Sequence, residues 1–252
     1  MIPSHPLSIS DSKPLLSPGP GGPEPGEIVP DLSGHPPRAD SLQLLVRRNQ
    51  IMKRCFDITV GSFVLFFSLP FIGMSLFLVW LVSPGLPLFC QSREGRGGAR
   101  LRVWKIRTMY PDAEQRLGEY LSNNPEDRAQ WERNCKIRDD PRVLPVIGTF
   151  LRRFSIDELP QLWLVLRGQL SLVGPRPLPE YHLRKLEPEL RRLRQQVRPG
   201  ITGLWQIMAR SEGGIDAYEM YDGYYLRNWY FFLDVHIIGK TVMSVIRGDG
   251  AY

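Results

Sequence analysis

The stretch Ile58–Val82, ITVGSFVLFFSLPFIGMSLFLVWLV, decides the fold, because its 25 residues include no charged side chain. A helix needs about 20 mostly apolar residues to cross a bilayer, so this stretch predicts a membrane helix. Pro70 lies at its middle, where proline removes a backbone donor and kinks or breaks a helix. Ser68 can bond to the carbonyl that Pro70 leaves free. Ser68 and Pro70 therefore mark a predicted membrane break.

The charges around this stretch leave its topology open. A spanning helix shows an excess of Lys and Arg on its cytoplasmic side. Here basic residues flank both ends: Arg47, Arg48, Lys53 and Arg54 before the stretch, and Arg93, Arg96, Arg100 and Arg102 after it. A re-entrant helix–break–helix would explain this, with arms of about 12 residues, or about 18 Å, in a core of about 30 Å. A spanning helix and a re-entrant helix both fit the residues.

The N-terminal segment and the overall charge bound the function. Residues 1–40 contain ten prolines, five glycines and no Phe, Trp or Tyr, which predicts a disordered tail. No secretory signal is expected there, and the three cysteines are expected to be reduced. The net charge of +6 indicates anionic partners. Membrane lipid and phosphates fit better than nucleic acid, for which the chain has no recognisable motif.

Residues 41–154 read as a basic amphipathic helix, the membrane segment and a small β element. Residues 101–109 alternate partly like a strand with a basic face. Lys105 and Arg107 on that face could meet phosphate, although a solvated strand face explains them equally well. Residues 112–138 read as a polar, helix-prone insertion, and Asp139-Asp140-Pro141 as a turn. Asp57 is expected to pair with Lys53 or Arg54.

The stretch Ser155–Trp163, SIDELPQLW, carries the candidate chemistry. Ser155 and Glu158 have the spacing of a capping box, in which Glu158 would only cap a helix. Asp157 at a helix N-terminus is expected to stay ionised, as a nucleophile requires. Glu158 points elsewhere on the helix and suits Mg²⁺ or a proton. Arg152, one turn earlier, could neutralise phosphate oxygens.

Two rigid loops also indicate phosphate chemistry. Pro175 and Pro177 fix the backbone around Arg176, whose guanidinium then loses little entropy on binding a phosphate. Arg198 opens a second loop, Arg198–Gly203, and Arg210 follows it. Between and beyond the loops, residues 183–197 read as a basic amphipathic helix and residues 233–246 as a core helix. Together the elements predict an α+β, mostly α-helical, monotopic membrane protein with amphipathic surface helices around a small β element.

From about residue 50 onward, these motifs resemble the bacterial sugar transferases, the small monotopic polyprenyl-phosphate phosphoglycosyl transferases. The resemblance rests on the KRCFD stretch at 53–57 with Pro70, on the Asp157-Glu158 pair and on the two arginine loops. It implies a re-entrant membrane helix and a catalytic pair in which Asp157 is the nucleophile and Glu158 assists, with Mg²⁺ held at both. It also implies phosphate or substrate binding by Arg152, Pro175, Arg176, Pro177, Arg198, Arg210, Lys105 and Arg107.

The resemblance implies transfer of a sugar 1-phosphate from a UDP-sugar to undecaprenyl phosphate, with release of UMP, at the cytoplasmic face of a bacterial inner membrane. The insertion at 112–138 and the ending GDGAY at 248–252 look like an exopolysaccharide branch that favours galactose or glucose 1-phosphate. That branch often has an additional N-terminal transmembrane bundle, which is not expected here. Leu69-Pro70 and Met208-Ala209 depart from the family pattern and put the break and the sugar or uridine pocket in question.

These expectations divide the chain into a tail (1–40), a membrane segment (41–95) and a cytosolic catalytic domain (96–252). A homodimer is one option that the sequence leaves open. The competing hypothesis is a membrane-anchored scaffold that holds anionic lipid and performs no catalysis. In that case Glu158 is a helix cap, and the arginine loops need no particular geometry, because adhesion to lipid needs charge alone.

Overall fold

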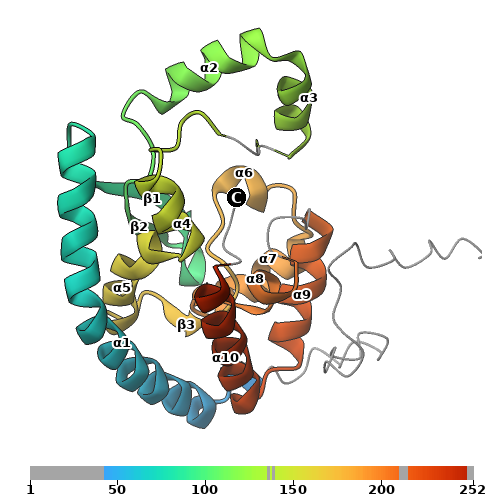
Figure 1. Ribbon diagram of the computed structural model, residues 1–252. Helices are drawn as coiled ribbons and strands as arrows, with labels where there is room; N and C mark the ends of the chain where they lie inside the picture. Colours follow the sequence, from blue (N-terminus) through green and yellow to red (C-terminus); the bar gives the residue numbers. More distant parts are fainter. Residues whose placement is uncertain (1–42, 135–136, 138–139, 210–214, 249–252) are drawn as a thin grey trace, which may run out of the picture. The chain divides into compact units, whose positions relative to one another are not determined.

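The computed structural model describes residues 43–134, 137, 140–209 and 215–248, and Figure 1 shows the arrangement of its elements. The expectations for the tail at 1–40, for Asp139 and for the ending at 249–252 lie outside these residues. The described elements are η1 (Gln43–Leu45), α1 (Arg47–Val82), β1 (Leu88–Glu94), η2 (Arg96–Gly98), β2 (Arg100–Ile106), α2 (Ala113–Asn123), α3 (Pro125–Asn134), α4 (Ile147–Arg153), η3 (Ile156–Gln161), α5 (Leu162–Leu166), β3 (Ser171–Val173), α6 (Glu180–Leu183), α7 (Pro188–Gln196), β4 (Gly200–Thr202), α8 (Leu204–Met208), α9 (Ile215–Arg227) and α10 (Phe231–Arg247).

Helix α1 is one continuous helix of 36 residues that contains Pro70. The predicted amphipathic segment before the apolar stretch is therefore mostly the first part of α1 and not a separate helix. The helix is not interrupted at Pro70, but Figure 1 shows its two ends running in different directions. Proline is the usual cause of such a bend, because it removes one hydrogen bond without ending the helix. The structure thus corrects the predicted break to a bend.

Helix α1 exposes large apolar side chains and buries small or polar ones, the reverse of a helix in a water-soluble protein. Its buried residues recur on one face and are mostly small or polar: Asp57, Gly61, Ser68, Ser75 and Val79. Its exposed residues include large apolar side chains: Phe63, Phe66, Phe67, Leu69, Phe71, Met74, Phe77, Trp80 and Leu81. By length and composition α1 can cross a membrane, the one such helix among the described residues. An exposed apolar face of this kind suits lipid rather than water, which is consistent with the predicted membrane helix.

The basic start of α1 anchors the helix to the rest of the protein. Arg54 donates to the carbonyls of Val165 and Leu166 at 2.6 and 2.8 Å, at the end of α5. Lys53 pairs with the fully buried Asp234 of α10 at 2.5 Å. Lys53 and Arg54, two basic side chains of the predicted amphipathic helix, therefore hold α1 against α5 and α10.

Asp57 provides a third anchor, with partners different from those predicted. Its carboxylate accepts hydrogen bonds from the Ser171 hydroxyl at 3.1 Å and from the Leu172 amide at 3.0 Å. Lys53 and Arg54, the predicted partners, make their closest contacts elsewhere. The predicted pairing is therefore not formed, and the carboxylate instead connects α1 to β3.

The small β element is a hairpin. β1 and β2 pair antiparallel from Leu88 with Ile106 to Glu94 with Arg100. The turn between them uses Gly97 and Gly98, both at positive φ, where a side chain would be strained. The predicted strand at 101–109 is confirmed over most of its length, whereas β1 was not predicted because its residues show no clear alternation.

A second, parallel pair of strands joins the two arginine loops. Ser171 pairs with Gly200 and Val173 with Thr202, although about thirty residues separate these strands. Gly174 and Gly200 let the backbones approach closely: a Cβ on Gly200 would collide with the Gly174 nitrogen. The glycines next to each arginine therefore serve to bring the loops together.

The main core lies around this parallel pair and is formed by residues from α1, α5, α7, α8, α9 and α10. The insertion is helical as predicted, with Leu117 of α2 buried. The amphipathic helix predicted at 183–197 is divided into α6 and α7. In α10, Leu233, Asp234 and Ile237 are buried, whereas Val242, Met243 and Ile246 are exposed. The predicted core helix is thus core only in its first turns.

Candidate active site

Asp157 and Glu158 lie in η3, a six-residue 3₁₀ helix that follows α4. Ser155 precedes it in a left-handed conformation with φ of 52°, and its side chain forms no capping hydrogen bond. The predicted capping box is therefore not formed. The helix expected to begin at this acid pair is also divided, because η3 ends at Gln161 and α5 begins as a new helix at Leu162.

Glu158 is held by two cations from distant segments. Its Oε1 accepts a hydrogen bond from Lys105 Nζ at 2.5 Å and from Arg176 Nη2 at 3.1 Å. Burial alone would raise the pKa of Glu158, but attraction to Lys105 and Arg176 lowers it to about 2. Glu158 is consequently ionised throughout the physiological range. The strand β2 and the Pro175–Pro177 loop, both identified as candidate phosphate sites, thus meet at the acid pair.

Asp157 is in a different environment from its neighbour. It is 8% exposed, and its Oδ2 lies 3.9 Å from Lys105 Nζ. Burial raises the pKa of Asp157 to about 6, against the opposing attraction of Lys105. The carboxylate predicted to be held ionised by a helix terminus is instead poorly solvated. At neutral pH it remains mostly ionised, and poor solvation makes a carboxylate a more reactive nucleophile.

Arg152 approaches the pair from the end of α4. Its Nε donates to the Thr108 hydroxyl at 2.8 Å, which fixes the side chain beside the end of β2. Burial lowers the pKa of Arg152, and the negative charge of Asp157 opposes that effect. The guanidinium is close enough to Asp157 for their charges to interact, as the predicted role requires.

The Pro175–Pro177 loop is supported by a buried ion pair that the sequence analysis did not identify. Arg194 of α7 pairs with Asp222 of α9 and also donates to the carbonyl of Arg176. Burial lowers the pKa of Arg194 to about 10. In the sequence, Arg194 is one of several basic residues in an amphipathic pattern. No local signal connects it to Asp222, 28 residues away.

Arg93 of β1 is a second residue that sequence reasoning did not identify. Burial and repulsion from Arg176 lower the pKa of Arg93, while the charge of Glu158 opposes them. Arg93 therefore lies close enough to Arg176 and Glu158 for their charges to interact. Since β1 is paired with β2 in register, the strand that carries Lys105 also fixes the position of Arg93.

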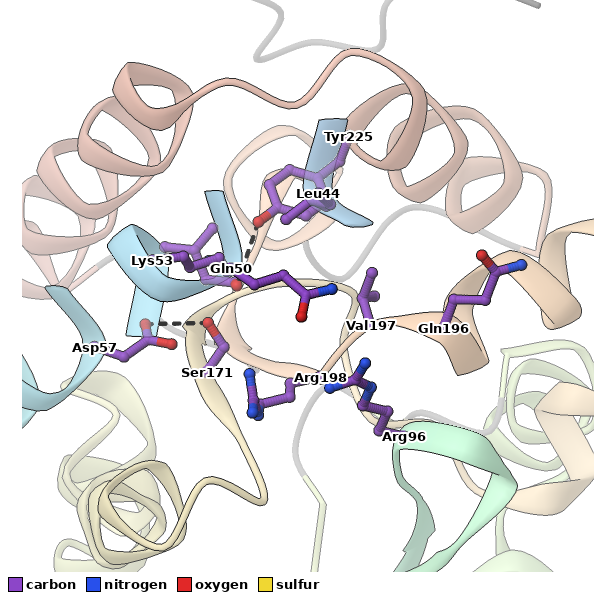
Figure 2. A pocket seen from close by; sticks show the side chains of 11 residues that line it. Leu44, Gln50, Lys53, Asp57, Arg96, Ser171, Gln196, Val197, Arg198 and Tyr225 are labelled. Carbon is purple, nitrogen blue, oxygen red and sulfur yellow. Dashed lines mark hydrogen bonds between the residues drawn. The ribbon is translucent and has the colours of Figure 1, made fainter. Parts of the chain in front are cut away.

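Two of the predicted cations, Arg107 and Arg198, form their hydrogen bonds away from the acid pair. Arg107 donates to the Ser83 carbonyl at 2.9 Å and so caps the end of α1. Arg198 donates to the Gly168 carbonyl at 2.9 Å and lines a separate cavity, shown in Figure 2. Arg210 lies outside the described residues. Ser68 and Pro70, the predicted break, lie within α1.

The residues present can hold Mg²⁺ only in a minimal way. Among the described residues, no group of three or more His, Cys, Asp or Glu side chains could surround a metal ion. The side chains that could bind the ion are the Asp157 and Glu158 carboxylates. Mg²⁺ is commonly bound by one or two carboxylates together with water and substrate phosphates. Both cations on Glu158 bind the same oxygen, Oε1, so the pair fits this minimal set.

This arrangement combines one buried carboxylate with a set of cations. Lys105 and Arg176 are tied to Glu158, and Arg93 and Arg152 stand nearby. Fixed guanidinium and ammonium groups stabilise the charge that develops on phosphate oxygens. The geometry suits nucleophilic attack by Asp157 on a phosphorus atom whose oxygens the cations hold.

Comparison with known proteins points to one family. Residues 48–248 match the bacterial sugar transferase family. The chain is 37% identical over 217 residues to the undecaprenyl-phosphate galactose phosphotransferase of Salmonella typhimurium, covering 83% of this chain and 43% of that protein. It is 36% identical over 218 residues to the UDP-galactose-lipid carrier transferase of Erwinia amylovora, covering 84% and 44%.

A third similar protein is matched over most of its own length. The chain is 35% identical over 202 residues to the exopolysaccharide production protein ExoY of Sinorhizobium fredii, covering 80% of this chain and 88% of that protein. The chain thus spans less than half the length of the Salmonella and Erwinia proteins but nearly all of the Sinorhizobium protein.

Proposed function

The chain belongs to the bacterial sugar transferase family, and from this premise we propose that it transfers a sugar 1-phosphate from a UDP-sugar to undecaprenyl phosphate. The observation that carries the proposal is the environment of Asp157, which is 8% exposed and 3.9 Å from Lys105. The names of the similar proteins support the substrate classes, since they include a galactose phosphotransferase that acts with undecaprenyl phosphate.

In the first step, an oxygen of the Asp157 carboxylate attacks the β-phosphorus of the UDP-sugar. A bond forms between that oxygen and phosphorus, and the bond from phosphorus to the oxygen that bridges the two phosphates breaks. The bridging oxygen leaves with the electron pair, so UMP is released and a phospho-aspartyl sugar remains. Covalent catalysis divides one difficult transfer into two easier ones.

The cations of the site offset charge during this step. Arg176 and Lys105 are held by Glu158, so little entropy is lost when they meet phosphate oxygens. Arg93 and Arg152 add positive charge around the same point. Asp157 and Glu158 would hold Mg²⁺ together with the diphosphate oxygens, where the ion supplies further positive charge.

In the second step, an oxygen of undecaprenyl phosphate attacks the same phosphorus. The bond between phosphorus and Asp157 breaks, the carboxylate is regenerated, and the product is the sugar joined to the lipid through a diphosphate. Glu158 remains ionised throughout because its two cations stabilise its charge. Its role is to position Lys105 and Arg176 against the oxygens of each phosphate in turn.

The lipid acceptor requires a site at a membrane surface. Helix α1 packs along α5 and η3, so the membrane helix and the acid pair are neighbours. We assign α1 a re-entrant topology, in which the bend near Pro70 returns the helix to the cytoplasmic face of the inner membrane. Basic residues precede and follow the apolar stretch in the sequence, which supports this topology, because both flanks then face anionic lipid.

The competing hypothesis, a lipid-binding scaffold, predicted that Glu158 caps a helix. Its side chain instead binds Lys105 and Arg176, and Ser155 forms no cap. A scaffold has no need of a poorly solvated aspartate surrounded by cations from three separate segments. The geometry therefore favours catalysis.

The test is UMP release from a panel of UDP-sugars in the presence of undecaprenyl phosphate and Mg²⁺. The proposal expects one or a few sugars to give UMP in step with the lipid product. A single-turnover reaction without lipid acceptor should leave the sugar phosphate attached to Asp157, detected as added mass on the peptide that contains it. Turnover without that adduct, in rapid-quench samples, would overturn the covalent step.

A further inference from the structure

A cavity lies beside β3, the first strand of the parallel pair. It is lined by Gln50, Lys53, Asp57, Arg96, Ser171 and Arg198, among others. In Figure 2 the side chains of Arg96 and Arg198 lie next to each other on one wall, and Gln50 of α1 extends toward them. The acid pair and Arg176 are not among its lining residues.

Two guanidinium groups line this cavity, and the one carboxylate among its lining residues is that of Asp57. The pKa of Arg198 is lowered by burial and by repulsion from Arg96 and Arg54, and the charge of Asp57 only partly opposes these effects. Among the described residues, no carboxylate forms an ion pair with either arginine. By contrast, the other charged residues of the cavity are occupied: Lys53 by Asp234, and Asp57 by Ser171 and the Leu172 amide. Like charges held together at a cost in free energy indicate a site for an anion.

The protein holds both arginines in place from outside the cavity. Arg198 donates its Nε to the Gly168 carbonyl, which leaves the terminal amino groups of its guanidinium to face the cavity. Arg96 sits at the tip of the β1–β2 hairpin. That tip is fixed by Glu94, which accepts hydrogen bonds from Arg191 at 2.9 Å and from Gln195 at 3.0 Å. Glu94 is thereby engaged with α7 rather than with Arg96.

We infer that this cavity is a second anion-binding site, separate from the catalytic centre, which takes a phosphate group between Arg96 and Arg198. Two guanidinium forks match the oxygens of a phosphate, and the Gln50 amide can donate to a third oxygen. Gln50 and Lys53 belong to the first turns of α1, so the cavity opens beside the start of the membrane helix. The phosphate is therefore that of an anionic lipid headgroup or a free phosphate. The inference does not depend on the proposed reaction.

The test uses the full chain in detergent and variants of the exposed hairpin arginines. Arg96→Gln removes one guanidinium from the cavity. Arg102→Gln is the matched control, because Arg102 is an exposed arginine of the same hairpin that does not line the cavity. Arg198 is avoided, since its contact with Gly168 also supports the fold. Unfolding midpoints are measured during titration with inorganic phosphate, and in micelles containing phosphatidylglycerol or phosphatidylcholine.

The catalytic centre contributes equally in all three proteins, so the differences report on the cavity. We expect Arg96→Gln to weaken the apparent affinity about tenfold, the effect of losing one charged hydrogen-bonding group. Arg102→Gln should match the wild type. A weaker response of Arg96→Gln to inorganic phosphate identifies free phosphate as the ligand, and a weaker response to phosphatidylglycerol alone identifies a lipid headgroup. Equal responses of Arg96→Gln and wild type, or no response of the wild type to either probe, would overturn the inference.

Discussion

Lys105 donates to Glu158 at 2.5 Å, and the same ammonium group stands 3.9 Å from Asp157. The attraction of this one lysine lowers the pKa of both adjacent carboxylates, yet their net pKa shifts have opposite signs. The pKa of Glu158 is lowered to about 2, while that of Asp157 is raised to about 6 because burial outweighs the lysine's attraction. Adjacent carboxylates with pKa values this far apart are suited to different roles.

Asp157→Asn should reduce UMP release by about a thousandfold or more, because the amide cannot form the bond to phosphorus. The substitution should not lower the unfolding midpoint at pH 7, since burial disfavours the charge that it removes. Activity is measured as UMP release and stability by thermal unfolding. Asp216→Asn, which changes an exposed aspartate of α9, is the matched control and should retain full activity. Wild-type activity of Asp157→Asn would exclude Asp157 as the nucleophile.

The pH profile should report the ionisation of Asp157. Its pKa is raised to about 6, so kcat/KM for the UDP-sugar should be level above that pH and fall about tenfold per pH unit well below it. Lys105→Gln removes a charge that lowers this pKa, so the acidic limb should move to higher pH. The comparison requires full profiles of both proteins. If the acidic limb stays at the same pH in Lys105→Gln, the group that titrates there is not Asp157.

Asp222→Asn should destabilise the protein by about 3–5 kcal/mol, because it leaves the buried Arg194 without its counter-ion. The loop that carries Arg176 should then lose its support, since Arg194 also donates to the Arg176 carbonyl. We expect the KM for UDP-sugar to rise in addition to the loss of stability. Asp127→Asn on α3 is the control, because Asp127 accepts its hydrogen bond from Tyr120, far from the loop.

Gly200→Ala should destabilise the protein by about 3 kcal/mol or more, because the new methyl group would collide with the backbone of Gly174. The control is Gly118→Ala on α2, where a Cβ meets nothing within 4 Å. Alanine there should stabilise the helix by about 0.5–1 kcal/mol. Denaturant unfolding in detergent measures both changes. Equal effects of the two substitutions would contradict the close approach of the two strands.

The topology of α1 is tested with single cysteines at Val46 and Ala99, both exposed, in a background without the three native cysteines. A membrane-impermeant thiol reagent added on the cytoplasmic side should label both positions if α1 is re-entrant. Pro70→Ala should straighten the helix, so that the two positions come to lie on opposite sides. Labelling of Val46→Cys and Ala99→Cys from opposite sides in the otherwise unchanged helix would establish a spanning topology.

The sequence predicts best those features that depend on local composition. The apolar stretch identifies α1, and the partial alternation around Lys105 identifies β2. Pro70 is correctly identified as a point of weakness, but the outcome is a bend. One missing hydrogen bond does not end a helix when the remaining bonds and the packing against α5 are retained.

What the sequence does not predict depends on contacts between distant residues. Ser155 and Glu158 have the spacing of a capping box, but Glu158 is drawn instead to Lys105 and Arg176, which are 53 and 18 residues away. Charge-assisted bonds to buried cations are stronger than a cap at the surface. The pair of Arg194 with Asp222 is hidden for the same reason. The sequence pattern around Arg194 predicts its own helix, as does the pattern around Asp222, but neither pattern indicates that the two residues form a pair.

The inverted faces of α1 also determine how the protein must be handled. Because its aromatic flank points outward, the surrounding acyl chains complete the tertiary packing that side chains provide elsewhere. When those acyl chains are removed, the apolar face of α1 is exposed to water on every copy, and the copies associate through that face. Purification in short-tailed detergent should therefore yield aggregates, whereas a lipid disc of native thickness should keep the protein dispersed.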